Sequence, residues 1–295
     1  IARSYNWVNL ANLPPYVIRQ LVLIALMGGA LYLHLPTDAA SATIMGVASY
    51  WIITAGQFLI VSRRLATKVA PGPKAYDLKY WLTISSPIFL IEAFYLLLTY
   101  SDVIVLKQYA PPNDVAVYYA ASKTLALVAF VYYAVAQTAA RKFAEFHTSG
   151  DRARLAAFLA LVIRLTFWPS FAATVLVLIF GEPLLWLFGH TFTGGYHLMF
   201  ILAVGLLARA SVGPVERLLI MLGQHTACAM IYAFAFAINV GLCVLLIPHY
   251  GPAGAAVSIS TALVVESILL YVVTKHRLGY HVFVFGRAVV PRDDA

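Results

Sequence analysis

The lysine and arginine residues of this sequence are sorted between long apolar runs, and this sorting constrains the fold more than any other feature. Eight runs of low charge lie at 19–35, 43–62, 80–100, 115–140, 155–180, 197–222, 227–248 and 253–274. Of the 20 lysines and arginines, 15 lie before or at the start of the first run, in every second gap, or after the eighth run. One lies in an alternate gap and four lie within runs. Lysine and arginine stay on the cytoplasmic side when a polytopic membrane protein inserts. The pattern therefore predicts eight transmembrane helices with both ends in the cytoplasm.

The composition supports the membrane interpretation. Hydrophobic residues make up 62% of the chain and charged residues only 11%, whereas a soluble domain has about 25% charged residues. Most runs are long enough to cross a hydrocarbon core of about 30 Å as a helix. The net charge of +8 is spread over the cytoplasmic gaps, where anionic lipid headgroups explain it without a nucleic-acid partner. We expect an all-α bundle embedded in a lipid bilayer.

The gaps between the runs are short, which limits the chemistry available to the chain. A membrane enzyme that builds or ligates glycans needs an extramembrane loop or domain to hold its donor and acceptor, and the gaps have no room for one. The sequence also lacks a Ser-His-Asp, HExxH, Walker or DxD-like constellation at usable spacing. We therefore expect a transporter with no catalytic residues, metal or cofactor. A membrane glycan polymerase or ligase is the alternative from a different class.

Five ionisable residues lie inside the apolar runs at positions that call for a partner or a function. Such a side chain at the centre of a span costs about 2.5–3.5 kcal/mol on insertion scales. Glu92 and Glu266 lie near the middle of their runs and are candidates for coupling transport to an ion. Lys123, Arg164 and Arg209 are candidate contacts for an anionic substrate. The alternative for each is a structural ion pair between helices.

The sixth run carries a charged stripe. Arg209, Gly213, Glu216 and Arg217 are spaced i, i+4, i+7 and i+8, which places them on one face of a continuous helix. Pro214 interrupts the hydrogen-bond ladder beside them and predicts a kink. The spacing indicates a kinked helix that lines a water-filled cavity, with Glu216 and Arg217 as further candidate substrate contacts. A local pair between Arg209 and Glu216 is the structural alternative.

Four segments together resemble the polysaccharide repeat-unit flippases. SDVIVLKQYAPPNDVAVYYAASKTLALV resembles their third hairpin, and GEPLLWLFGHTFTGGYHLMFILAVG resembles a segment with the pattern LLxLFGxxFxxG. GPVERLLIMLGQHTA is similar to the helix that follows. LLIPHYGPAGAAVSISTALVVESILLYVVTKHRLG resembles the IPxYGxxGAAx(A/S)T hairpin and last span, and this match is the most specific. These flippases transport O-antigen and exopolysaccharide units and belong to the multidrug/oligosaccharidyl-lipid/polysaccharide exporter superfamily.

The resemblance implies a function. Members have two six-helix lobes around a central cavity and work by alternating access. They move an undecaprenyl-pyrophosphate-linked oligosaccharide from the inner to the outer leaflet of the bacterial cytoplasmic membrane, for lipopolysaccharide or exopolysaccharide biosynthesis. Basic cavity residues would meet the pyrophosphate or acidic sugars, and a polysaccharide polymerase or export machinery is the expected partner. A drug or lipid II exporter of the same superfamily is the alternative.

The resemblance also divides the chain. We expect 1–62 to hold the last two helices of the first lobe, 63–79 to be the cytoplasmic linker, 80–280 to be the complete second lobe and 281–295 to be a cytoplasmic tail. Members have twelve to fourteen spans, so four helices are expected to precede this sequence. The residues that match family motifs have expected structural roles, in turns, close helix packing and the end of a span: Asp102, Tyr118, Gly189, Gly195, Gly223, Pro248, Gly251, Gly254, Ala255 and Ala256.

Overall fold

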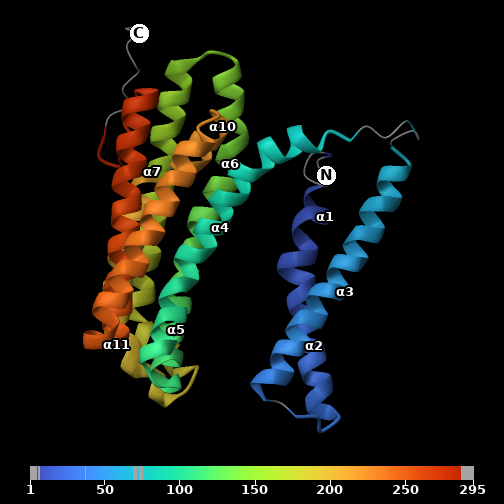
Figure 1. Ribbon diagram of the computed structural model, residues 1–295, viewed down its shortest axis with the longest axis vertical. Coiled ribbons are helices and arrows are strands. Elements are labelled where there is room, and N and C mark those ends of the chain that lie inside the picture. The colour runs from blue at the N-terminus through green and yellow to red at the C-terminus, as the bar shows by residue number, and fades with distance from the viewer. Residues whose placement is uncertain (1–4, 6, 37, 69–71, 73–75, 287–295) are drawn as a thin grey trace. The chain divides into compact units, whose positions relative to one another are not determined.

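The chain folds into apolar helices in the computed structural model, which describes residues 5, 7–36, 38–68, 72 and 76–286. Within these residues there is no strand, and seven helical segments are long and apolar enough to cross a membrane (Figure 1). The chain divides into two compact units, Ile1–Tyr76 and Asp77–Ala295. Parts of the expected linker (69–71 and 73–75) and of the expected tail (287–295) lie outside the described residues.

The first unit is a helical hairpin. Its elements are α1 (Val8–Leu13), a π-helical turn η1 (Pro14–Ile18), α2 (Arg19–Tyr32) and α3 (Ala39–Ala66). The first crossing runs continuously over Asn9–Tyr32, so it starts ten residues earlier than the sequence indicates. Asp38 caps α3 by accepting a hydrogen bond from the Ser41 N–H at 2.9 Å, and this bond and the Ser41 hydroxyl lower the pKa of Asp38. Gln57 Nε2 donates to Leu10 O at 2.8 Å and ties the two helices together.

The second unit is a helical bundle. Its elements in chain order are α4 (Leu78–Tyr109), α5 (Pro112–Leu125), η2 (Ala126–Val128), α6 (Ala129–Thr148), α7 (Arg152–Ile179), α8 (Gly181–Trp186), η3 (His190–Gly195), α9 (Tyr196–Val212), α10 (Val215–Met221) and α11 (His225–Leu278). Together α5, η2 and α6 make one crossing over Pro112–Thr148. The helix α4 packs mainly on α11, and α6 packs mainly on α7.

The 54 residues of α11 form a hairpin of two helical arms rather than one rod. A straight helix of that length would extend about 80 Å, far beyond a hydrocarbon core of about 30 Å. The helical geometry breaks at Gly251, where φ is 54° and ψ is −132°, a conformation open to glycine. A Cβ atom on Gly254 would lie 2.6 Å from Leu246 O, so the arms touch just beyond the break. Arg277 Nη1 donates to Gln224 Oε1 at 2.8 Å and joins their far ends. The two arms bring the number of crossings to the predicted eight.

The motif residues lie at closely packed positions, in tight turns and near the end of a span. Ala255 and Ala256 are fully buried, and a Cβ on Gly195 would lie 3.0 Å from Val117 Cγ1. Gly189 and Gly223 have positive φ. Pro248, which the sequence assigns to the end of a span, lies in the last turn of the first arm of α11, three residues before the break.

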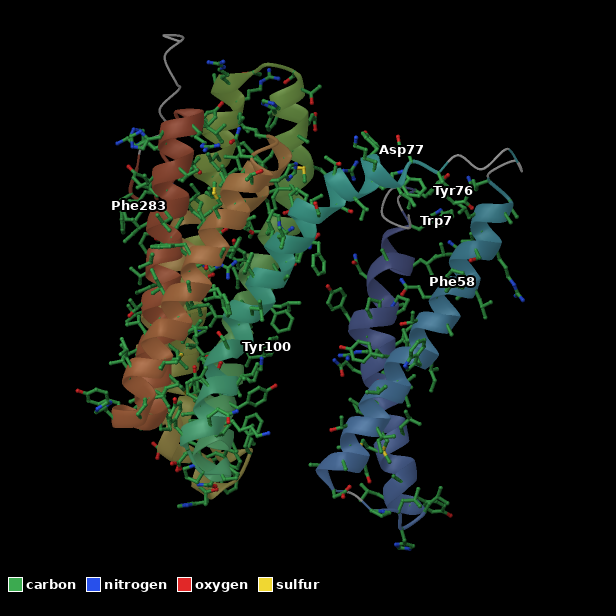
Figure 2. All side chains as sticks on the ribbon, in the orientation of Figure 1. Trp7, Phe58, Tyr76, Asp77, Tyr100 and Phe283 are labelled. Carbon is green, nitrogen blue, oxygen red and sulfur yellow. The ribbon has the colours of Figure 1, made fainter. Side chains whose placement is uncertain are left out.

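Large apolar side chains cover the outside of the second unit as well as its core. Tyr100 and Phe283 project outward and are 42% and 44% exposed (Figure 2). Two clusters of buried apolar residues fill the interior. A bundle that is apolar on both its inner and outer surfaces is suited to lipid rather than to water. We conclude that the chain is a multi-pass membrane protein.

The sixth run is broken rather than kinked, which corrects the expectation of a continuous charged stripe. The helix α9 ends at Val212, and α10 begins at Val215. Between them Gly213 has φ 67° and ψ −165°, so the residues before and after it do not share a helical face. The backbone N–H of Val284 donates to Ser211 O at 3.0 Å. A segment beyond the last helix, within the region expected to be a tail, therefore packs against the end of α9.

Candidate functional site

Arg209, on the last turn of α9, is the centre of a cluster of charged and aromatic side chains. Its side chain is only 14% exposed, and its Nε lies 3.6 Å from Glu266 Oε1 on the second arm of α11. Its Nη2 donates to the Tyr232 hydroxyl at 3.2 Å. The break at Gly213 ends α9 one turn later, so the guanidinium lies at the end of a helix, where the last carbonyls favour a cation.

Two tyrosine rings flank this guanidinium. The Cζ atom of Arg209 lies 5.0 Å from the ring centroid of Tyr95 on α4 and 5.1 Å from that of Tyr132 on α6. A cation over an aromatic face gains about 2 kcal/mol or more when water is excluded. The rings therefore hold a positive charge in the interior and leave its N–H donors free for acceptors.

Glu266 is the acid that faces Arg209, and its hydrogen bonding is incomplete. Its carboxylate is fully buried, and among the described residues neither of its oxygens has a donor at hydrogen-bond distance. Besides Arg209, the Tyr232 hydroxyl is the donor that interacts with this carboxylate. The Nε of Arg209 also lacks an acceptor at hydrogen-bond distance. A buried ion pair offsets the loss of hydration only when its geometry is good and its remaining oxygens and protons are hydrogen-bonded. This pair is therefore held together by charge at a substantial cost.

Glu216 and Arg217 form a second group on α10. The Tyr132 hydroxyl donates to Glu216 Oε2, and Arg217 Nε lies 3.6 Å from Glu216 Oε1. Arg217 Nη1 also lies 4.0 Å from Glu92 Oε1, whose side chain is 55% exposed. The break at Gly213 pairs Glu216 with its neighbour Arg217 instead of with Arg209. Tyr132 joins this group to the Arg209 cluster.

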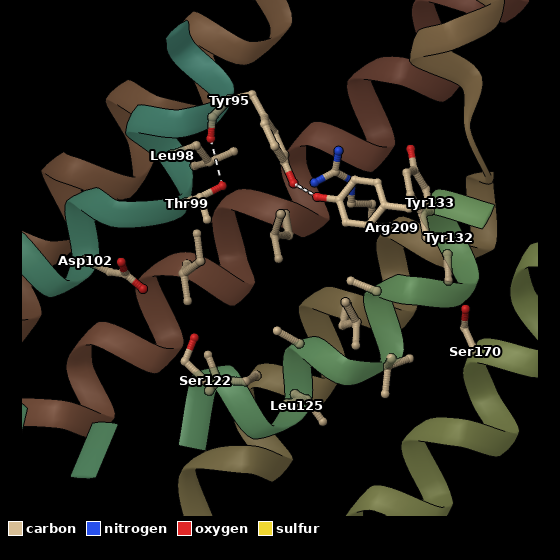
Figure 3. A pocket seen from close by; sticks show the side chains of 18 residues that line it. Tyr95, Leu98, Thr99, Asp102, Ser122, Leu125, Tyr132, Tyr133, Ser170 and Arg209 are labelled. Atoms are coloured by element: carbon tan, nitrogen blue, oxygen red, sulfur yellow. Dashed lines mark hydrogen bonds between the residues drawn. The ribbon is translucent and has the colours of Figure 1, made fainter. Parts of the chain in front are cut away.

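A cavity of about 160 Å³ lies beside Arg209 inside the second unit (Figure 3). Leucine, isoleucine, valine and alanine make up most of its wall, and Arg209, Tyr95, Tyr132 and Tyr133 stand at one end (Figure 3). Thr99, Asp102, Ser122 and Ser170 add further polar atoms to the lining. A water molecule needs about 10–15 Å³ of such space. The cavity therefore has room for several waters or for a small polar group.

Tyr95 and Tyr133 share a hydrogen bond between their hydroxyl groups at the edge of this cavity (Figure 3). Tyr95 belongs to α4 and Tyr133 to α6. Because α4 packs mainly on α11 and α6 mainly on α7, a side-chain bridge links two helices whose backbones pack elsewhere. Such a bridge can open by side-chain rotation alone.

Asp102 lies on the opposite side of the cavity, in a well-bonded polar group. The Tyr118 hydroxyl and the Val103 N–H both donate to its carboxylate. Beside it, Asn239 Nδ2 donates to Ser101 Oγ at 2.9 Å across α4 and α11. Asp102 and Tyr118 are separate motif positions in the sequence, and the structure joins them directly.

The remaining candidates lie apart from Arg209. Lys123 Nζ stands 4.8 Å from the Tyr100 ring centroid and 5.0 Å from that of Tyr119. Arg164 is exposed on α7. The structure thus brings together Arg209, Glu266, Glu216 and Arg217, with Glu92 at the margin, and leaves Lys123 and Arg164 outside this cluster.

Four tyrosines of the site are absent from the candidates that the sequence indicates. Tyr95, Tyr132, Tyr133 and Tyr232 lie well inside apolar runs, where aromatic residues usually serve packing or the membrane interface. Their position far from the ends of the apolar runs could have marked them as candidates, because a tyrosine hydroxyl inside a membrane bundle needs a hydrogen-bond partner. Their convergence on one guanidinium depends on three different helices, which no local pattern encodes.

Comparison with known proteins yields a fold but no family. No protein-family model matches the chain, and no curated protein matches it. Among solved structures, the crystal structure of a proline-to-alanine mutant of a MATE protein matches with a TM-score of 0.68 and 16% sequence identity. The match covers 89% of this chain and 61% of that structure, so the chain spans less than two thirds of its length. The chain thus shares the fold of a MATE protein, as the resemblance to the exporter superfamily implies.

Proposed function

We propose that this chain belongs to a membrane exporter that moves lipid-linked polysaccharide repeat units across the bacterial cytoplasmic membrane. The cargo class is an undecaprenyl-pyrophosphate-linked oligosaccharide, and the mechanism is alternating access. The fold shared with a MATE protein and the motif segments at 101–128 and 245–279 support this assignment. The orientation, with both ends in the cytoplasm, follows from the sorting of lysine and arginine.

One observation carries the proposal: a buried guanidinium that opens on a cavity within the membrane. Arg209 is held by Glu266 and flanked by two tyrosine rings, and it lines the 160 Å³ cavity. Ionisable residues within spans mark substrate and ion pathways because their burial is otherwise costly. Guanidinium is also well matched to phosphate oxygens, which it binds through two parallel hydrogen bonds.

The other candidates have graded roles in this proposal. Lys123 supplies a second positive charge on α5, and Arg164, Glu216 and Arg217 remain candidate substrate contacts. Glu92 and Glu266 are the candidates for ion coupling. Glu266 is the stronger of the two, because it is fully buried whereas the Glu92 side chain is 55% exposed.

A drug exporter of the same superfamily is the second candidate function. The observation that favours it is the cavity wall, which is mainly aliphatic and aromatic. Apolar, aromatic-lined cavities with a few fixed polar groups are common sites for small organic molecules.

A transport assay separates these functions. The full-length protein is reconstituted in vesicles, and the transfer of a fluorescent lipid-pyrophosphate-linked oligosaccharide to the outer leaflet is measured against export of a cationic dye. The proposal predicts transfer of the lipid-linked oligosaccharide, its loss in Arg209→Ala, and no dye export. Dye export without transfer of the lipid would contradict it. Lys107→Ala, at an exposed position of α4, is the comparison variant that tests whether the loss of any basic residue has the same effect.

A further inference from the structure

Arg209 stands between a buried acid and a cavity. Its guanidinium lines the cavity, and Glu266 contacts it at 3.6 Å from the second arm of α11. A guanidinium has five N–H donors. One group, Nη2, donates to Tyr232, and Nε has no acceptor at hydrogen-bond distance among the described residues. Donors therefore remain for an acceptor that enters the cavity.

The pair with Glu266 is poorly satisfied and is therefore exchangeable. Both carboxylate oxygens are buried without hydrogen bonds within the described part of the chain. Forming two hydrogen bonds to a guanidinium recovers more of the lost hydration than a contact at 3.6 Å does. An oxyanion that binds Arg209 in that way would be a better partner than Glu266.

We infer that the cavity is an oxyanion site in which the anion takes Arg209 from Glu266, and Glu266 then binds one proton. This inference rests on the proposed function for the source of the anion. The charges balance: the anion replaces the carboxylate as the counter-ion of the guanidinium, and one proton from the buffer acid neutralises the carboxylate. The bond between that acid and its proton breaks, the carboxylic O–H bond forms, and no other covalent bond changes. A carboxylate left alone in this interior cannot stay charged, because burying an isolated charge is far more costly than protonating it.

The other groups around Glu266 do not replace Arg209 as its counter-ion. Tyr232 on the first arm of α11 interacts with the Glu266 carboxylate through its hydroxyl but carries no positive charge, and Glu216 on α10 carries the same charge as Glu266. Around Arg209 the remaining ionisable groups are the neutral phenols Tyr95 on α4 and Tyr132 and Tyr133 on α6, and the Cys228 thiol on the first arm of α11. Arg217 is already paired with Glu216 and Glu92. Loss of Arg209 therefore leaves Glu266 with only a proton to neutralise it.

The cavity restricts the class of anion. Its volume of about 160 Å³ and its mainly aliphatic wall suit an oxyanion on a small organic group. Thr99 and Ser122 line the wall away from Arg209 and can bind hydroxyls (Figure 3). Phosphate at the head of a prenyl chain and the carboxylate of an acidic sugar share this chemistry. Separate titrations with a prenyl pyrophosphate and with an acidic sugar distinguish the two sources.

The experiment counts protons taken up when an anion binds. Purified full-length protein in detergent is titrated with geranyl pyrophosphate, and separately with glucuronate, in buffers that differ in ionisation enthalpy. The inference predicts that wild-type protein takes up about one more proton per bound anion than Glu266→Gln does. Subtracting the proton count of Glu266→Gln from that of wild type cancels any protons that the ligand itself gains or loses, because both proteins bind the same ligand. Glu266→Gln should also bind the anion at least about tenfold more tightly at neutral pH, since its Arg209 has no competing acid.

Two further variants make the result decisive. Arg209→Gln should lose at least about tenfold in affinity, and Glu182→Gln, an exposed acid on α8, should keep the wild-type proton count. Binding of geranyl pyrophosphate alone assigns the site to the prenyl head, and binding of glucuronate alone assigns it to an acidic sugar. If neither binds, or if Glu266→Gln takes up as many protons as wild type, the inference is wrong. If Glu266→Gln does not fold, the number of protons that wild type takes up per anion is used instead, after subtraction of the protons that the ligand itself gains or loses. About one proton supports the inference, and a count of zero contradicts it.

The proton count also separates this inference from the proposed function. A protein that moves the lipid-linked oligosaccharide without proton uptake dependent on Glu266 would refute the inference alone. A protein that binds the anion with the predicted proton but moves no such lipid would refute the proposed function.

Discussion

Asp102 and Glu266 are two of the buried acids of the second unit, and they are bonded in opposite ways. Asp102 lines the cavity, and Glu266 contacts Arg209 at its other end. Asp102 accepts hydrogen bonds from the Tyr118 hydroxyl and the Val103 N–H. Glu266 has a guanidinium at 3.6 Å and, among the described residues, no hydrogen bond. A satisfied buried polar group makes a structure rigid, whereas a partly satisfied one marks a group that changes partners. From this difference we propose that Asp102 serves the fold and Glu266 serves transport.

The largest expected effect is on transport, from Arg209→Gln. Removing one partner of a buried charged contact costs about 2–5 kcal/mol, so substrate transfer should fall at least about 30-fold. The amount of folded protein should stay close to that of wild type. Transfer is measured in reconstituted vesicles and divided by the amount of protein that elutes as one species.

Tyr118→Phe is the matched variant on the Asp102 side. Like Arg209→Gln, it removes the buried donor that faces an acid. Transfer per folded molecule should nevertheless remain within about twofold of wild type. If Tyr118→Phe lost as much transfer as Arg209→Gln, the assignment of Asp102 to the fold and of Glu266 to transport would be wrong.

Asp102→Ala should have the largest effect on stability. It leaves the buried Tyr118 hydroxyl without its acceptor, and an unsatisfied buried donor costs about 1–3 kcal/mol. The variant should unfold at a lower dodecyl sulfate fraction in mixed micelles. Asp114→Ala, on the partly exposed first turn of α5, provides the comparison near the surface.

Replacing both members of the other pair should not destabilise the unit. In Arg209→Met with Glu266→Leu, a poorly bonded ion pair becomes apolar packing, which is neutral or stabilising by about 1–4 kcal/mol for many buried pairs. The same mixed-micelle unfolding measures it. A loss of stability as large as that of Asp102→Ala would mean that the pair holds the bundle together.

The smallest effect is expected from Tyr133→Phe, which removes the bridge to Tyr95 at the cavity edge. A partly exposed hydrogen bond of this kind contributes at most about 1 kcal/mol to stability. The association rate for geranyl pyrophosphate should rise, while the proton count per anion stays unchanged. Tyr119→Phe, which alters an exposed hydroxyl on α5, should leave the rate as it is.

Much of the fold follows from local features of the sequence, but the site depends on contacts between distant residues. The sorting of lysine and arginine predicts eight crossings, and the motif around Gly251 places the turn between the last two. The break at Gly213 does not follow in the same way, because an apolar run with one proline indicates a kink as readily as a break. Glu266 and Arg209 each stand out in the sequence for the cost of burying them. Their pairing, like the converging tyrosines, depends on how α4, α6, α9 and α11 pack together.

The central claim is that Glu266 gains a proton when Arg209 turns to an anion, and infrared difference spectroscopy tests it directly. The spectrum of the full-length protein is recorded before and after addition of geranyl pyrophosphate in neutral buffer. The account predicts a new carbonyl band of a protonated carboxylic acid, present in wild type and Asp102→Asn but absent in Glu266→Gln. The same band in Glu266→Gln, or saturating anion binding to wild type without the band, would contradict it.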